Sequence, residues 1–198
     1  MNRSGLSCID NIEGDYLYSD RMRAEIRKEI GLIEPLDALE RESILNVLDW
    51  IDSGAEICRL EKPATPPKHL VSYFAVVDDD HLLLVDHINA ELWLPTGGHV
   101  EPGEHPRDTA LREAKEELSI EAAFLKDGPI FITITETVGK TAGHTDVSLW
   151  YLLRGDRSAR LDFDDTEFRE VRWFHKNDIP LDRSDQHMPR FLQKLSEQ

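Results

Sequence analysis

Hydrophobic residues early in the chain recur every three to four positions, the spacing that places them on one face of a helix. The first such run consists of Met22, Ile26 and Ile30. Ser19 precedes this run as a favourable N-cap, and Gly31 ends it. Residues 1–18 show little periodicity and several turn-forming residues, so we expect a loose arm there.

A second helical run begins between Pro35 and Asp37 and ends at Ser53-Gly54. The positions predicted to face inward are Leu39, Ile44, Val47, Leu48 and Ile51. Together the two runs predict a helical hairpin over about the first sixty residues. Such a hairpin could pack on the rest of the protein, cap a substrate site or make a homodimer contact. Packing is the simplest expectation.

Three prolines then stiffen the chain, because proline fixes its own backbone angle and donates no backbone hydrogen bond. They are Pro63, Pro66 and Pro67. We therefore place a domain boundary here, with residues 1–62 as an N-terminal arm and helical extension and residues 63–198 as the main domain.

Beyond the prolines, β-branched and aromatic residues gather in short runs that predict strands. The runs are residues 69–77, 82–85, 122–124, 130–138, 147–154 and 170–174. Turns are expected at residues 78–80 and 139–143, and a final helix from Pro189, a favoured first helical position. Strands interrupted by one long helix and followed by another predict an α/β fold with a mixed sheet covered on both faces.

The composition narrows the functional classes. The chain has 198 residues, of which 40% are hydrophobic, so it can bury a core. Its 23 basic and 39 acidic residues give a net charge of −16, which argues against a nucleic-acid-binding surface. No stretch resembles a signal peptide or a membrane span. We therefore expect a cytoplasmic protein without a membrane or nucleic-acid partner. Cys8 and Cys58 are read as ordinary thiols.

Residues 97–120 contain a helix whose side chains sort cleanly at about 100° per residue. Its apolar stripe consists of Ala110, Leu111, Ala114 and Leu118. Glu113, Glu116 and Glu117 fall together on the neighbouring stripe. We expect the apolar stripe to be buried and the three carboxylates to converge in a cleft.

Like charges at these spacings repel by a few tenths of a kcal/mol per pair, and a bound cation would remove the conflict. Carboxylate oxygens suit Mg²⁺ or Mn²⁺ rather than zinc. Because Mg²⁺ is usually held together with substrate phosphates, the expected substrate is a phosphate ester or anhydride. The alternative is an acidic helix face that is simply solvated.

The same stretch resembles the signature of the Nudix hydrolase family. In that signature, glycine, five residues, glutamate and seven residues precede Arg-Glu-apolar-any-Glu-Glu-any-Gly-apolar. Gly98, Glu104 and residues 112–120 match every fixed position except one, where Ser119 replaces the glycine. The segment Leu92-Trp93-Leu94-Pro95 just upstream is also typical of the family. The resemblance implies a Nudix-type α/β/α sandwich, preceded here by the helical hairpin, with residues 63–198 as the Nudix domain.

The resemblance also implies roles for individual residues. Glu113, Glu116 and Glu117 would bind the metal, together with the backbone carbonyl of Gly97. Glu113 could instead be the general base, since it is expected to face the same cleft. Arg112 is expected to orient glutamates rather than to touch the substrate.

Several polar residues around this stretch are left with open roles. Glu104 is expected to partner Arg112 or to be an additional ligand; otherwise it is a first-turn acid favoured by the helix dipole. A further acid from a later loop is implied, and the candidates are Asp164, Asp165, Glu167 and Glu170. The eight histidines, including His99 and His144, show no HExxH spacing, so surface or structural roles are expected for them.

The implied function is a divalent-metal-dependent cleavage of a pyrophosphate bond in a nucleoside diphosphate linked to another group, by metal-activated water. A non-catalytic nucleotide-binding or regulatory module is the main alternative, although such modules usually lose the glutamates that are present here. The isomerase branch acting on isoprenoid diphosphates uses an active-site cysteine. Both cysteines of this chain precede the main domain.

Overall fold

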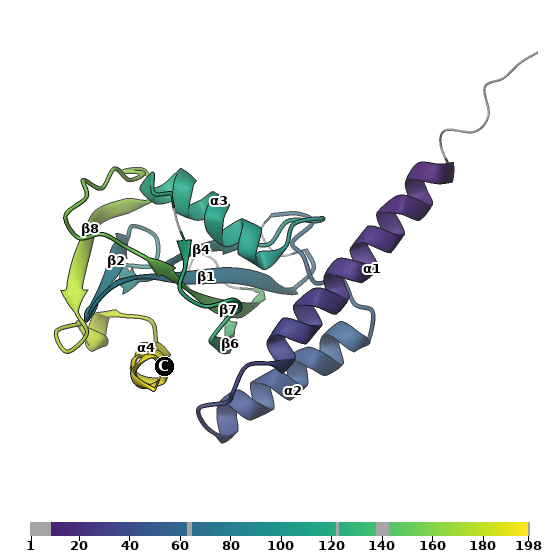
Figure 1. The fold of residues 1–198 in the computed structure, drawn as a ribbon, viewed down its shortest axis with the longest axis horizontal. Helices are drawn as coiled ribbons and strands as arrows, with labels where there is room; N and C mark the ends of the chain where they lie inside the picture. Colours follow the sequence, from purple (N-terminus) through teal and green to yellow (C-terminus); the bar gives the residue numbers. More distant parts are fainter. Residues whose placement is uncertain (1–8, 63–64, 122, 138–142, 198) are drawn as a thin grey trace, which may run out of the picture.

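The computed structural model describes residues 9–62, 65–121, 123–137 and 143–197 (Figure 1). Its helices are α1 (Ile9–Gly31), α2 (Ala38–Asp52), α3 (Pro106–Leu118), the 3-10 helix η2 (Leu181–Arg183) and α4 (Met188–Ser196). Its strands are β1 (Lys68–Asp78), β2 (His81–His87), β3 (Leu92–Leu94), β4 (Thr96–His99), β5 (Ala123–Phe124), β6 (Phe131–Glu136), β7 (Thr145–Arg154) and β8 (Phe168–His175). No helix in the described part is long and apolar enough to cross a membrane.

The strands form one mixed sheet around β1. Its main order is β3-β2-β1-β7-β5, with β4 paired to β1, β6 to β7 and β8 to β2. β1 and β7 are parallel, from Lys68 opposite Thr145 to Val77 opposite Arg154. The other strand pairings are antiparallel. The pairings of β1 therefore bring β4 and β7 together, although they are far apart in the chain.

Side chains alternate between the two faces of the sheet, as the period of a strand requires. In β1, Phe74 and Val76 lie in one apolar core and Ala75 and Val77 in the other. Helix α3 covers the first face and α4 covers the second (Figure 1). The residues that α3 and α4 contribute to these cores are Ala110, Ala114, Leu118, Met188 and Phe191. The predicted α/β/α sandwich is confirmed.

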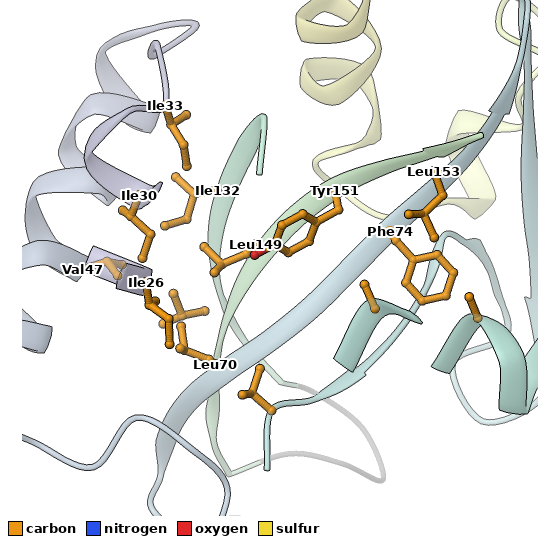
Figure 2. Packing of buried hydrophobic residues seen from close by; sticks show 14 of the residues in the cluster. Ile26, Ile30, Ile33, Val47, Leu70, Phe74, Ile132, Leu149, Tyr151 and Leu153 are labelled. Atoms are coloured by element: carbon orange, nitrogen blue, oxygen red, sulfur yellow. The ribbon is translucent and has the colours of Figure 1, made fainter. Parts of the chain in front are cut away.

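The predicted helical hairpin is also confirmed, and it packs on the sheet. Ile26, Ile30 and Val47 of α1 and α2 lie in the same core as Leu70 of β1 and Ile132 of β6 (Figure 2). This is the core that α3 also covers. Whether residues 1–62 form a separable unit stays a prediction.

A buried ion pair joins the hairpin to the last helix. The fully buried Glu40 places Oε2 3.2 Å from Nζ of Lys194, whose side chain is 4% exposed. Oε2 also accepts from the backbone N–H of Leu36 at 2.6 Å, and Oε1 accepts from that of Ile132 at 3.3 Å. Nζ donates to the carbonyl oxygen of Glu34 as well. Each of the two buried charges thus has polar partners. Burying either charge without partners would be strongly unfavourable.

Two expectations about the hairpin are corrected. Helix α1 begins at Ile9 rather than near Ser19, so residues 9–18 are helical rather than a loose arm. This first part of α1 extends away from the body of the molecule (Figure 1). Leu39 is 52% exposed rather than inward, because Glu40 occupies the buried position beside it.

The strand boundaries differ by a few residues from those predicted. Strand β4 was not predicted, because two glycines in four residues leave no hydrophobic alternation. Strand β8 begins two residues earlier than expected, and β6 ends at Glu136. The predicted strand ends at Ala122 and Val138, and most of the expected turn at 139–143, lie outside the described residues. Leu111 is half-buried, whereas the rest of the predicted apolar stripe of α3 is buried.

Candidate active site

Strand β4 brings the glycine pair against β1 and α3 at very short range. Gly98 lies opposite Ser72, and Gly97 lies opposite Tyr73. A Cβ atom at Gly98 would be 1.9 Å from Oε1 of Glu113, and one at Gly97 would be 2.3 Å from the carbonyl oxygen of Ser72. Only glycine leaves room for the strand on one side and the carboxylate on the other.

Both ends of α3 are fixed by local contacts. At the start, Nδ1 of His105 accepts from the backbone N–H of Arg107 at 3.2 Å, and Oγ of Ser72 donates to the carbonyl oxygen of Pro106 at 2.7 Å. At the end, Ser119 adopts the left-handed conformation with φ of 53°. A residue other than glycine is strained in this conformation by roughly 1 kcal/mol. The helix nevertheless ends where the signature predicts.

Arg112 holds the acidic side chains of this region in place. Its Nε and Nη2 donate to the two carboxylate oxygens of Glu104 at 2.9 and 3.0 Å. Its Nη1 donates to Glu113 at 2.7 Å and to Glu116 at 3.3 Å. Thr109 donates to Glu104 at 2.8 Å. These hydrogen bonds outweigh burial and lower the pKa of the Glu104 carboxyl. Glu104 thus partners Arg112, one of the three roles weighed for it.

Glu117 lies apart from this hydrogen-bonded group. Its Oε2 is buried and has no hydrogen-bond partner in the part of the chain that the structure describes, unlike the oxygens that Arg112 holds. Burial, followed by the negative charges of Glu113, Glu167 and Asp164, raises the pKa of Glu117 to about 9. Burial also raises the pKa of Glu113, against the opposing effect of Arg112. The side chain of Glu116 is 61% exposed.

Two of the four later acids lie near the glutamates of α3. Asp164 and Glu167 both act on the charge of Glu117, and the backbone N–H of Asp164 donates to the carbonyl oxygen of Glu117 at 3.0 Å. Glu170 instead pairs with Arg172 at 2.6 Å, and Asp165 is exposed. The loop before β8 therefore brings Asp164 and Glu167 to the site.

A second polar cluster was not predicted from the sequence. His69, His99, His144 and Asp146 place one ligand atom each within 4.8 Å of one another. His99 and His144 had been given surface or structural roles, and the other two had not been singled out. The available signal was the His144-x-Asp146 spacing, because residues two apart on an extended segment share a face.

Arg59 is another residue that sequence reasoning missed. Its guanidinium is half-buried, which lowers its pKa, and the nearby negative charges are those of Asp146, Glu101 and Glu113. No hydrogen bond or ion pair to this guanidinium is found in the described part of the chain. Its backbone N–H donates to the carbonyl oxygen of Val100, which places it beside the end of β4. The charge of Arg59 is thus felt by carboxylates of both groups, Glu113 of α3 and Asp146 of the histidine cluster.

Part of the chain is similar in sequence to known proteins. Over 58 residues, the chain is 41% identical to the asymmetrical bis(5'-nucleosyl)-tetraphosphatases of Mus musculus and Rattus norvegicus. That match covers 29% of this chain and 40% of each relative. The chain therefore spans less than half the length of these curated relatives.

Solved structures share the fold at low sequence identity. The MutT NUDIX hydrolase from Burkholderia pseudomallei has a TM-score of 0.53 and 21% identity, covering 64% of this chain and 96% of that one. The Ap4A hydrolase of C. elegans has a TM-score of 0.52 and 20% identity, covering 65% and 96%. The NUDIX domain model matches residues 68–195, which is well over half of the chain. This protein therefore belongs to the NUDIX domain family.

Proposed function

We propose that this protein is a divalent-metal-dependent hydrolase that cleaves a pyrophosphate bond in a nucleoside diphosphate linked to another group. The observation that carries the proposal is the buried, unpartnered carboxylate oxygen of Glu117 beside Glu113. A solvated acidic helix face would leave its carboxylates in water. Here one carboxylate is desolvated among other acids, which is unfavourable unless a cation binds it.

The residues present fit Mg²⁺ or Mn²⁺. Glu113, Glu116 and Glu117 offer carboxylate oxygens and Gly97 offers a backbone carbonyl, which are the ligand types that hard cations prefer. When bound, such an ion lowers the pKa of a water molecule and offsets negative charge on the phosphates. Asp164 and Glu167 lie near enough to Glu117 to add to the negative charge of this site.

The residues of the chain position the reacting groups. Arg112, itself fixed by both oxygens of Glu104, determines where the carboxylates of Glu113 and Glu116 lie. Glu113 is close to this site and its burial raises its pKa, which suits a general base as well as a ligand. Loss of metal affinity in Glu113→Gln would favour the ligand role, and loss of kcat with unchanged affinity would favour the base.

We propose that Arg59 binds a substrate phosphate. The protein carries a net charge of −16, so an anionic substrate needs a local cation. The half-buried guanidinium of Arg59 lies near Glu113 and has no competing ion pair in the described residues. A planar guanidinium can donate two hydrogen bonds to one phosphate.

The substrate class is drawn from the chemistry of the relatives. The names of the mouse and rat relatives specify a bis(5'-nucleosyl) tetraphosphate. That molecule, nucleoside triphosphates and nucleotide sugars all contain the same phosphoanhydride bond. We therefore expect one of these nucleoside polyphosphates or diphosphate derivatives to be cleaved.

A substrate panel assayed with and without Mg²⁺ tests the proposal. The panel contains a dinucleoside tetraphosphate, a nucleoside triphosphate and a nucleotide sugar, with phosphate or nucleotide release as the readout. We expect turnover that excess chelator abolishes. Glu116→Gln and Glu117→Gln should each lower kcat by a factor on the order of 10² or more. Arg59→Met should mainly raise KM.

The exposed Glu121 offers a matched control, since Glu121→Gln removes the same charge just beyond α3. That variant should keep wild-type kcat. Near wild-type turnover in both Glu116→Gln and Glu117→Gln would remove the metal site from α3. Nucleotide binding without turnover by the wild-type protein on the whole panel would instead favour the non-catalytic module.

A further inference from the structure

The pairing of three strands brings three histidines and one aspartate together. His69 of β1 lies opposite Asp146 of β7 in the parallel register. His99 of β4 lies opposite Val71, which shares a face with His69 because it is two residues further along β1. His144 precedes β7 and shares a face with Asp146 in the same way. Strands β1, β4 and β7 lie together in the sheet (Figure 1).

The distances within this cluster match a metal coordination shell. Oδ1 of Asp146 is 3.2 Å from Nε2 of His144, 3.4 Å from Nε2 of His69 and 3.6 Å from Nε2 of His99. In a tetrahedral zinc site with bonds of about 2.0–2.1 Å, neighbouring ligand atoms are about 3.3–3.4 Å apart. The widest separation here, 4.8 Å, would close with movements of roughly 1 Å, which side-chain rotation supplies.

The atoms that face one another are not satisfied by hydrogen bonds. His69 is fully buried, and its Nε2, Nε2 of His99 and Oδ1 of Asp146 find no hydrogen-bond partner among the described residues. Nδ1 of His69 is 2.8 Å from the carbonyl oxygen of Pro66, which can only accept. Nδ1 therefore carries the proton, and in the neutral ring the lone pair of Nε2 faces a carboxylate oxygen. A cation between the two atoms removes this repulsion.

The ring nitrogens of His69 and His144 that point away from the cluster contact oxygen atoms, as is usual for histidines that bind a metal. Oγ1 of Thr137 donates its proton to the carbonyl oxygen of His144 at 3.0 Å and lies 3.2 Å from Nδ1 of the same histidine. Together with the contact from His69 to Pro66, this fixes two imidazole rings with Nε2 directed at the carboxylate. Histidine ligands are usually oriented in this way through their other ring nitrogen.

We propose that His69, His99, His144 and Asp146 bind a borderline transition-metal cation, with Zn²⁺ as the best match, at a site distinct from the glutamates of α3. Three imidazoles and one carboxylate suit Zn²⁺, whereas Mg²⁺ prefers an all-oxygen shell. Four protein ligands leave no open position, which makes the site structural rather than catalytic. The proposal does not depend on the proposed hydrolase activity.

The location of His99 would let the bound ion affect the position of β4 relative to α3. His99 directly follows Gly98, whose backbone is packed against the carboxylate of Glu113. A cation shared by β1, β4 and β7 would fix the end of β4 and therefore the distance from the glycine pair to α3. Zn²⁺ bound here would stabilise the fold near the active site without contacting a substrate.

Metal binding to the full-length protein tests the site directly. Bound metal is first removed from the protein with a chelator, and the chelator is then removed. The protein is titrated with Zn²⁺ in the presence of excess Mg²⁺, because Mg²⁺ occupies the oxygen ligands of α3. We expect one equivalent of tightly bound Zn²⁺ and a raised Tm. Co²⁺ in place of Zn²⁺ should give the intense visible absorption of a tetrahedral complex.

Variants locate the bound ion. His99→Gln and Asp146→Asn should lower Zn²⁺ affinity by at least about tenfold, the lower end of the effect of changes in the groups around a metal. His175→Gln, at the far end of β8, is the matched control and should bind Zn²⁺ like the wild type, as should Glu117→Gln. Equal affinity in His99→Gln and the wild type would overturn the proposal.

The cobalt spectrum of the wild type gives an answer that does not depend on the folding of any variant. Weak absorption typical of six-coordinate Co²⁺, or no Zn²⁺ binding in excess Mg²⁺, would mean that the cluster holds only protons. Loss of Zn²⁺ binding in a folded Glu117→Gln variant would place the ion on α3 and would equally contradict the site.

Discussion

The carboxylate of Glu117 combines burial, an unpartnered oxygen and acidic neighbours, so its protonation should be linked to both stability and metal binding. Its pKa rises from about 4.5 to about 9 in the folded, metal-free protein. Between these values the folded state holds a proton that the unfolded state has released. The free energy of unfolding of the metal-free protein should therefore fall as the pH rises through this window.

A divalent cation must displace that proton, so binding should strengthen with pH by up to about tenfold per pH unit below pH 9. Calorimetric titration of Mg²⁺ or Mn²⁺ in two buffers with different ionisation enthalpies measures the proton released. In Glu117→Gln the proton release and the pH dependence of Tm in chelator should both shrink. Wild-type proton release in that variant would assign the linkage to another group.

Residue-scale prediction succeeded where the chemistry lies in one continuous stretch. Arg112, Glu113, Glu116 and Glu117 could be found because a single helix sets their spacing. Arg59 and His69 could not, because each meets its neighbours only through contacts between segments that are far apart in the chain. The residues next to Arg59 and His69 in the sequence do not indicate which distant side chains these two will face.

At the scale of elements, the glycine pair joins β4 to its two neighbours, and the two glycines should respond differently to alanine. At Gly98 the added methyl group would meet the flexible end of Glu113, which can move. We expect Gly98→Ala to keep most of its stability while kcat falls by about 10²-fold, since a displacement near 1 Å can have that effect. Activity and thermal melts of the same preparations measure both.

At Gly97 the methyl group would instead meet the backbone of Ser72, so Gly97→Ala should lower Tm by disturbing the pairing of β1 with β4. Gly128 has no atom within 4 Å of an added Cβ, and Gly128→Ala is the matched control. Unchanged kcat in Gly98→Ala would show that the position of Glu113 does not matter for turnover.

The elements that periodicity predicted best are those whose ends are set by residues next to them in the sequence. Helix α2 begins and ends as expected because Asp37 caps its first turn and Ser53-Gly54 follows its last. Strand β4 could not be predicted from its own side chains, because the strand is defined by its backbone pairing with β1. Leu39 was assigned inward because local hydrophobicity cannot reveal that Glu40 finds a cation on α4.

At the scale of the whole molecule, the Glu40–Lys194 pair holds the hairpin against the rest of the fold. Lys194→Met would leave the buried carboxylate with only its backbone N–H donors. We expect the free energy of unfolding to fall by about 3 kcal/mol, at the low end for a broken buried pair. Urea denaturation measures the change.

The pair between Arg190 and Asp37, whose side chains are 22% and 41% exposed, joins α4 to the start of α2 and provides the more solvated control. Arg190→Met should change stability by less than about 1 kcal/mol. The double variant Glu40→Gln, Lys194→Met should recover part of the loss, because no uncompensated charge remains. Equal effects of Lys194→Met and Arg190→Met would mean that burial adds nothing to the first pair.

The same pair also bears on the order in which the molecule is assembled during synthesis. Glu40 leaves the ribosome 154 residues before Lys194, so a nascent chain holds the carboxylate but not yet its cation. Docking α2 against β6 at that stage would bury an unpaired charge, which is strongly unfavourable. The hairpin should therefore wait, already helical but undocked, until α4 emerges. A chain that stops short of α4 would carry the apolar faces of α1 and α2 exposed, where proteases that remove incomplete proteins can recognise them.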